Sequence, residues 1–134
     1  MPLELPVTTE PLSDEVRRFV LTSIPSVPYL EALLLLRAEP ERDWDAYTVA
    51  RRLYVTEHKA AELLRELQDA GLALRHPDSG GYRYEPRDAG LREMIDRVER
   101  LYATRLVEVT ALIHTRVDRR AVQFADAFRF KKEG

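Results

Sequence analysis

Basic side chains gather at two places in the middle of the chain, and the chemistry open to them is the binding of anions. Arg51 and Arg52 stand side by side, while Arg75, His76 and Arg83 surround a segment with two adjacent glycines. Guanidinium and imidazolium groups donate hydrogen bonds to phosphate oxygens, and arginine can donate two in parallel. Each residue alone is typical of a solvated surface. Together they indicate a surface that could grip a phosphate backbone.

Residue types that carry catalysis or hold metals lack the spacing that such chemistry needs. The chain has no cysteine, which excludes structural disulfides, thiol catalysis and thiolate zinc sites. Its histidines, His58, His76 and His114, do not have the i, i+4 spacing of a helical metal site. No serine lies in a nucleophile elbow, and Asp96 with Arg100 fits an i, i+4 salt bridge better than acid–base catalysis. The sequence predicts no enzyme, no metal site and no cofactor.

Length and composition favour one soluble domain. The chain has 134 residues, of which 45% are hydrophobic and 33% charged, as in ordinary globular proteins. The longest apolar run, residues 32–36, is far shorter than the roughly 20 residues of a membrane span. The first residues lack the basic start and apolar stretch of a signal peptide. We therefore expect a cytoplasmic protein without membrane contact.

The net charge of −2 is unevenly distributed. Residues 1–45 contain 4 basic and 9 acidic side chains, residues 46–85 contain 6 and 6, and residues 86–134 contain 11 and 8. Nucleic-acid binders usually carry a basic footprint, because the release of counterions drives much of their affinity. The middle third, where the two basic groups lie, has no net excess of positive charge.

Apolar spacing predicts four helices before residue 71. Residues 1–12 carry three prolines and read as an irregular arm. Ser13 and Ser26 are suitable caps for the first two helices, and the second helix, ending at Ala38, is apolar around most of its circumference, as a central core helix would be. Capping residues Asp45 and Thr56 then begin a short helix over 46–53 and a longer one from 57 to about 70.

A hairpin and a long helix are predicted to follow. Gly71 can adopt the left-handed conformation that ends a helix, and alternating segments 72–75 and 82–85 flank a Pro-Asp-Ser-Gly-Gly loop. From Asp88, apolar residues spaced by three and four predict one helix to about Arg116. Such a helix of about 28 residues is roughly 42 Å long. Such a helix would extend beyond a small domain, so a partner helix could cover its apolar face. Alternatively, the apolar face could simply pack against its own domain.

This order of elements resembles the winged helix-turn-helix of bacterial regulators of the MarR and related families. The resemblance covers residues 26–86, and its most specific part is the run Leu-Arg-Glu-Leu-Gln-Asp-Ala-Gly-Leu over 64–72. The flanking segments, 1–25 and 87–134, also resemble those of uncharacterised bacterial winged-helix proteins that finish in Phe-Ala-Asp-Ala-Phe-Arg, here residues 124–129. The resemblance implies a mainly α fold with a small β-hairpin. It also implies an N-terminal arm and helix, and a C-terminal dimerisation helix followed by a basic aromatic tail.

The resemblance further implies a homodimeric transcriptional regulator that inserts its second motif helix into the major groove of double-stranded DNA. Glu57 and Glu62 lie at outward positions of that helix, where their carboxylates would repel phosphates. The residues expected to touch DNA are Arg51, Arg52, Thr56, His58, Lys59, Arg65, Arg75, His76 and Arg83. Those expected to form the dimer seam are Leu91, Ile95, Val98, Tyr102, Leu106 and Val109.

Two alternatives remain open at this stage. The helix over 57–70 could be a core element whose outer face is merely solvated by mixed charges. The whole chain could instead be an interaction module that binds protein through this acidic face and through Phe124, Phe128 and Phe130. The residues specify neither an effector, nor a target sequence, nor the sign of regulation.

Overall fold

The computed structural model describes residues 12–115, which form six helical segments and a two-stranded hairpin. Predictions about the arm and the tail, including Phe124, Phe128 and Phe130, lie outside the described residues. In chain order the elements are α1 Asp14–Ser23, α2 Val27–Ala38, α3 Ala46–Leu53, α4 Glu57–Asp69, β1 Ala73–Arg75, β2 Tyr82–Tyr84, α5 Ala89–Thr104 and a last helical segment, Leu106–Thr115.

Five of the helices begin at side chains that cap them. Ser13, Ser26, Asp45, Thr56 and Asp88 each accept a hydrogen bond from the backbone N–H three residues further on. Each cap satisfies one of the N–H groups that a helix leaves without a partner in its first turn. The predicted starts of these helices are therefore confirmed.

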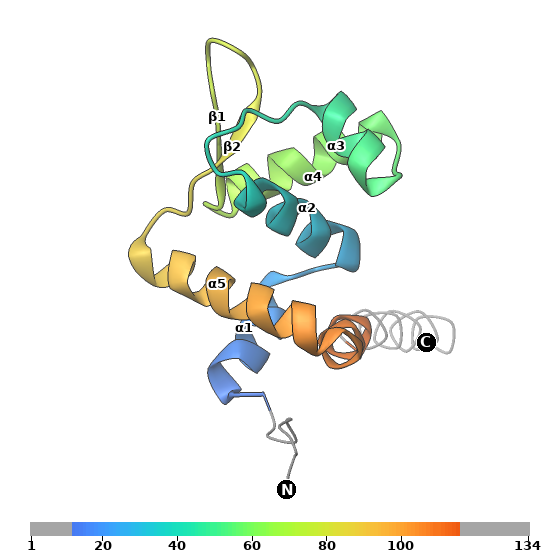
Figure 1. Cartoon of the computed structure of the whole chain (residues 1–134), viewed down its shortest axis with the longest axis vertical. Helices are drawn as coiled ribbons and strands as arrows, with labels where there is room; N and C mark the ends of the chain where they lie inside the picture. The colour runs from blue at the N-terminus through green and yellow to red at the C-terminus, as the bar shows by residue number, and fades with distance from the viewer. Residues whose placement is uncertain (1–11, 116–134) are drawn as a thin grey trace, which may run out of the picture.

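Helix α2 is the centre of the core, as its apolar circumference predicts. Its Leu30 and Leu36 are fully buried, and Leu63 and Leu67 of α4 are buried against the same core. Figure 1 shows α2, α3, α4 and the hairpin forming one unit, with α1, α5 and residues 106–115 beyond α2. No single helix in the described range is long and apolar enough to cross a membrane, and the pair α1 and α2, which passes only jointly, is bent by 109°.

The hairpin is an antiparallel pair with a third participant that the sequence pattern does not reveal. Strands β1 and β2 pair in the register Ala73 to Tyr84 and Arg75 to Tyr82. Trp44 then pairs with Tyr82 from the other side, with backbone N–H···O distances of 2.8 Å in both directions. A Cβ on Gly81 would lie 3.1 Å from Cβ of Asp43, so glycine permits this close approach. With this hairpin beside α3 and α4, the fold is a winged helix-turn-helix.

The prediction of one continuous helix from Asp88 to about Arg116 is wrong. Helix α5 ends at Thr104, Arg105 has φ −132° and ψ 49°, and a new helical segment begins at Leu106. Figure 1 shows the chain changing direction there. The hydroxyl of Thr104 donates to the carbonyl of Arg100 at 3.0 Å, and such bonds back to the preceding turn loosen or bend helices. Within residues 12–115, the single long helix that suggested a partner helix is therefore replaced by two shorter ones.

Candidate nucleic-acid interface

The outer face of α4 carries both signs of charge, and its ion pairs stay within the helix. Nε2 of His58 lies 3.3 Å from Oε2 of Glu62, and Nζ of Lys59 lies 3.8 Å from Oε1 of the same carboxylate. The His58 side chain is 84% exposed. Glu62 therefore holds the two basic side chains that the sequence places nearest to a bound base pair.

The first turn of α4 is closed by its cap. Oγ1 of Thr56 accepts the backbone N–H of Lys59 at 3.0 Å. The Thr56 hydroxyl proton is still available to donate, because accepting that bond uses only an oxygen lone pair. Thr56 can thus contact a phosphate while it caps the helix. Arg65, two turns further on, is exposed on the same helix.

The base of the wing is fastened by an acidic side chain that the sequence did not single out. Oδ1 of Asp43 accepts Nε of Arg83 at 2.8 Å, and its Oδ2 accepts the hydroxyl of Ser79 at 2.9 Å. The hydrogen bond from Arg83, followed by that from Ser79, lowers the pKa of Asp43. We call Asp43, Ser79 and Arg83 the wing clamp. Its Arg83 is already part of an ion pair and is not freely offered to a ligand.

The other two basic residues of the wing differ in their availability. Arg75 is exposed, and its Nε makes a long contact of 3.5 Å with the carbonyl of Gly80. Its backbone N–H donates to Oε1 of Gln68 at 2.9 Å, which ties β1 to α4. His76 is half-buried, and its enclosed Nδ1 has no hydrogen-bond partner among residues 12–115. Arg75 is therefore the wing residue best placed to meet a phosphate.

The two adjacent arginines of α3 have different surroundings. The guanidinium of Arg52 lies 5.3 Å from the ring centre of Trp44, and that of Arg42 lies 4.1 Å from it. Arg51 instead lies 5.7 Å from the ring of Tyr47, and its Nη1 is 3.4 Å from the Tyr47 hydroxyl. Cation–π contacts of this kind orient a guanidinium without neutralising it. Arg42, which sequence reasoning missed, thus joins Arg52 over the buried Trp44.

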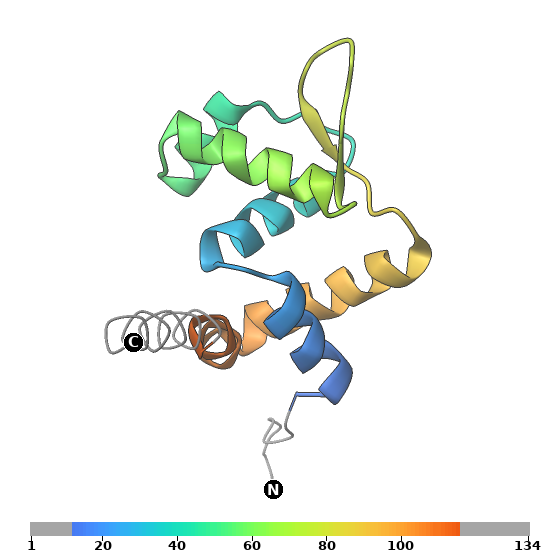
Figure 2. The ribbon, with the colours of Figure 1, turned by 180° about the vertical axis from the view of Figure 1, so that it is seen from behind.

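The basic side chains of α3 and those of the wing form two separate groups and not one continuous surface. The hairpin lies on one side of α4 and α3 on the other, in both Figure 1 and Figure 2. Within residues 12–115, Arg51, Arg52 and Arg75 form no salt bridge, whereas Arg83 does. Cationic groups are therefore available on both sides of the helix that would read a groove. The described residues contain no group of three side chains that could hold a metal ion.

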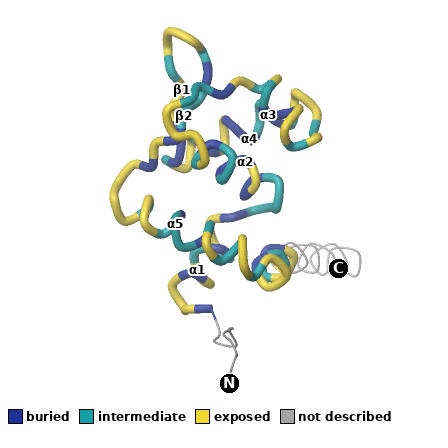
Figure 3. Tube along the Cα trace, viewed as in Figure 1, coloured by how far each residue is buried: buried dark blue, intermediate teal, exposed yellow. Residues whose placement is uncertain are grey.

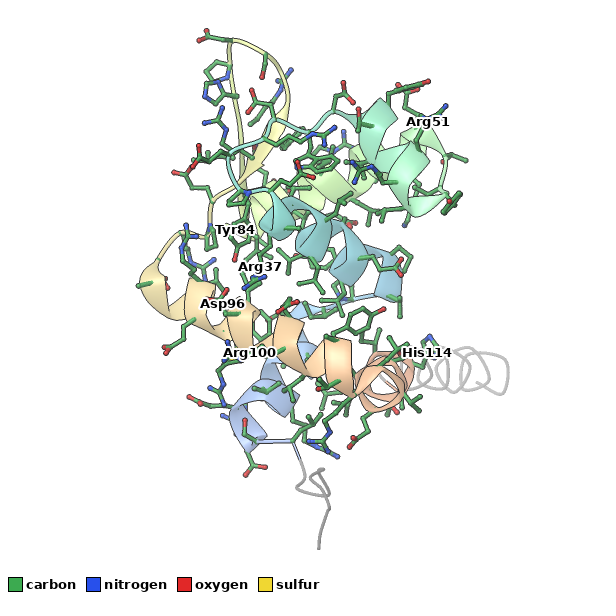
Figure 4. All side chains as sticks on the ribbon, viewed as in Figure 1. Arg37, Arg51, Tyr84, Asp96, Arg100 and His114 are labelled. Atoms are coloured by element: carbon green, nitrogen blue, oxygen red, sulfur yellow. The ribbon has the colours of Figure 1, made fainter. Side chains whose placement is uncertain are left out.

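The winged unit is attached to α5 by a polar junction. Nε of Arg37 on α2 lies 2.9 Å from Oδ1 of Asp96, and its Nη1 lies 3.8 Å from Glu99. The Tyr84 hydroxyl is buried and has no hydrogen-bond partner in the described part of the chain. Its burial, followed by the charge of Asp96, raises the pKa of Tyr84. Figure 4 shows Arg37, Tyr84 and Asp96 meeting between the two parts, with Arg51 far from them on α3. These polar contacts join the winged unit to α5 in addition to the buried side chains of Ile95 and Val98.

Several residues expected to form a dimer seam are used by the core of the single chain. Ile95, Val98 and Val109 are at most 1% exposed within this chain. The same segment leaves Leu106 52% and Val107 80% exposed, just after the break in the helix. Leu91 and Tyr102 are partly buried against the core.

Comparisons with known proteins give two similar structures. No protein-family model matches the sequence, and the search of curated proteins found no match. One similar structure is a possible transcriptional regulator from Methanosarcina mazei Go1, with a TM-score of 0.43 and 20% identity over 71% of this chain and 82% of that one. The other is the PcaV transcriptional regulator from Streptomyces coelicolor, with a TM-score of 0.47 and 24% identity over 89% of this chain and 86% of that one.

Proposed function

We propose that this chain is a DNA-binding transcriptional regulator of the winged-helix type, related to the MarR family. One observation carries the proposal: within residues 12–115, α4 has a capped N-terminus and an outer face whose ion pairs stay inside the helix, and arginines that form no salt bridge lie on both sides of it. A helix that enters the major groove needs both an accessible face and phosphate donors beside it.

Contacts to the DNA backbone outweigh contacts to bases in this proposal. Glu57 and Glu62 place two carboxylates on the face of α4 that would enter the groove, and Glu62 already engages His58 and Lys59. Phosphate contacts carry no sequence information of their own. The protein would therefore bind DNA weakly and with a modest preference among sequences.

We further propose that the protein acts as a homodimer, with its seam shifted from the predicted stripe. Ile95 and Val98 already belong to the core of one chain, so they are not available to a second copy. Leu106 and Val107 remain exposed just after the break in the helix, and the seam we propose includes them. A two-fold dimer would set the spacing between two DNA half-sites.

A binding titration with mixed genomic DNA fragments at two salt concentrations tests the proposal. We expect retardation at low salt and a steep loss of affinity at higher salt, because phosphate contacts release counterions. Arg75→Ala should weaken binding to all fragments about equally. Arg18→Ala, on the exposed face of α1, is the matched control and should leave binding unchanged.

The same titration can also contradict the proposal. If the purified protein retards no fragment at low salt, and Glu62→Gln does not create binding, the regulator proposal fails. The protein-binding alternative would then take its place.

A further inference from the structure

A second group of arginines lies away from the winged unit, where α1 meets α5. Arg97, Arg100 and Arg105 line a cavity of about 420 Å³ between the start of α1 and the second half of α5. Figure 4 shows Arg100 on α5, far from Arg51 on α3. In the described part of the chain, no residue of α2, α3, α4 or the hairpin lines this cavity. Its chemistry is therefore separate from that of the candidate nucleic-acid interface.

The walls of the cavity combine apolar side chains with a hydroxyl group. Leu12 and Val16 are buried, and Leu101 is partly buried against the core. Figure 3 shows a buried position at the start of the described chain, next to the exposed first turn of α1. Oγ of Ser13 accepts from the backbone of Val16 and from Nη2 of Arg97, so its own proton remains available to donate. Ligand sites of this size typically join apolar walls to a few polar groups.

The three arginines differ in how far a carboxylate already neutralises them. Nη1 of Arg97 donates to Oε1 of Glu15 at 2.9 Å. Arg105 donates two hydrogen bonds to Glu108, at 2.5 and 2.7 Å. Arg100 is exposed and forms no salt bridge within residues 12–115. Neither glutamate lines the cavity, so its lining is cationic and the charge of Arg100 is in excess.

We propose that this cavity binds a small organic anion, namely a single carboxylate attached to an aliphatic body. The guanidinium of Arg100 can donate two parallel hydrogen bonds to such a carboxylate. Leu12, Val16 and Leu101 would cover the aliphatic part, which is stabilised by leaving water. An inorganic anion would leave these walls unused, and a neutral ligand would leave Arg100 without a counter-charge. The inference does not depend on DNA binding.

A titration of the full-length protein with three probes tests both halves of this recognition. Octanoate should shift the amide NMR signals of the first turn of α1 and of residues 97–105. Octanamide has the same aliphatic body without the charge, and acetate has the charge without the body. Each of these two should bind at least about tenfold more weakly than octanoate, because each lacks one of the two interactions.

Substitutions around the cavity should change the affinity for octanoate in opposite directions. Arg100→Ala should weaken binding about tenfold, since it removes a charged hydrogen-bond donor, while the melting temperature stays unchanged. Glu15→Gln should strengthen binding about threefold, because it releases Arg97 from a carboxylate that is 74% exposed. Arg18→Ala removes the same charge from the exposed face of α1 outside the cavity. As the matched control, it should leave the affinity for octanoate unchanged.

Several results of this titration would overturn the inference. Equal affinity for octanoate and octanamide would mean that apolar contact alone explains binding, and equal affinity for acetate would mean that the walls take no part. Unchanged affinity in Arg100→Ala, or shifts confined to other elements, would place the anion elsewhere. If octanoate does not bind at millimolar concentration and Arg100→Ala dissociates a dimer in light scattering, the cavity belongs to a contact with a second copy. None of these results bears on DNA binding, which Arg75→Ala tests separately.

Discussion

Helices α4 and α5 carry similar numbers of charges and use them in opposite ways. On α4, Glu62 pairs with His58 inside the same helix. On α5, Asp96 reaches Arg37 on α2, and Arg97 donates to α1 at 2.9 Å. The ion pairs of α5 fasten it to its neighbours, whereas those of α4 leave its outer face unattached. A helix attached on one side only can present the other side to a ligand.

The largest expected effect comes from a charge placed beneath α5. Val98→Asp should destabilise the fold by more than about 3 kcal/mol, because it buries an unpaired carboxylate at a position that is 1% exposed. Urea unfolding at two protein concentrations measures this, and the loss should not depend on concentration. Arg65→Asp on the exposed face of α4 is the control and should stay within about 0.5 kcal/mol. Folded monomers of Val98→Asp would instead place Val98 in a dimer seam.

Removing the repulsive charge on α4 should have the next largest effect. Glu62→Gln should strengthen binding to duplex DNA about three- to tenfold, because the carboxylate repels phosphate and holds His58 and Lys59. Anisotropy titrations at low salt would show it. Asp69→Asn, at the far end of the same helix, should change affinity less. Equal gains from both changes would mean that only net charge matters.

The ion pair between α2 and α5 should contribute less to the free energy of unfolding than the buried side chain of Val98. Asp96→Asn should cost about 0.5–1 kcal/mol, because the pair with Arg37 is only partly exposed, at 28% and 37%. His58→Ala on α4 should cost less, since its pair with Glu62 is largely solvated. Thermal unfolding of the two variants compares them directly. A larger loss for His58→Ala would reverse the contrast between the helices.

The smallest expected effect is a local one in the wing. The hydrogen bonds from Arg83 and Ser79 lower the pKa of Asp43 in the folded protein. The stability that the ionised carboxylate contributes is therefore present above the unfolded pKa of about 3.9, and it is lost as pH falls through the folded pKa. Measured relative to the intrinsic amide rate, which itself falls with pH in this range, hydrogen exchange at Tyr82 should therefore accelerate below about pH 4. Asp43→Asn should accelerate it at neutral pH too. Unchanged exchange in that variant would show that Trp44 alone holds the strand.

Much of the fold is predictable from local sequence because local physics decides it. The caps, the apolar face of α4 and the turn at Gly71 each depend on a few neighbouring residues; Gly71 indeed has φ 79°. The pairing of Asp43 with Arg83 joins residues 40 positions apart, and no local pattern encodes it.

The candidate site was less predictable, because contacts between distant residues build it. Arg51 and Arg75 were expected from their type, but Arg42 and Asp43 take their places beside Trp44 and Arg83 only through the fold. Likewise, the apolar spacing continues unbroken through Arg105, and periodicity could not locate the break in the helix.

The position of Trp44 makes this protein its own optical reporter. It is the only tryptophan of the chain, fully buried, covered by the guanidinium groups of Arg42 and Arg52, and paired through its backbone with the wing strand at Tyr82. Fluorescence from a single indole in this enclosure responds to the distance of the two cations and to entry of water. A shift in emission when a duplex draws the arginines away would follow engagement of the wing without any attached dye.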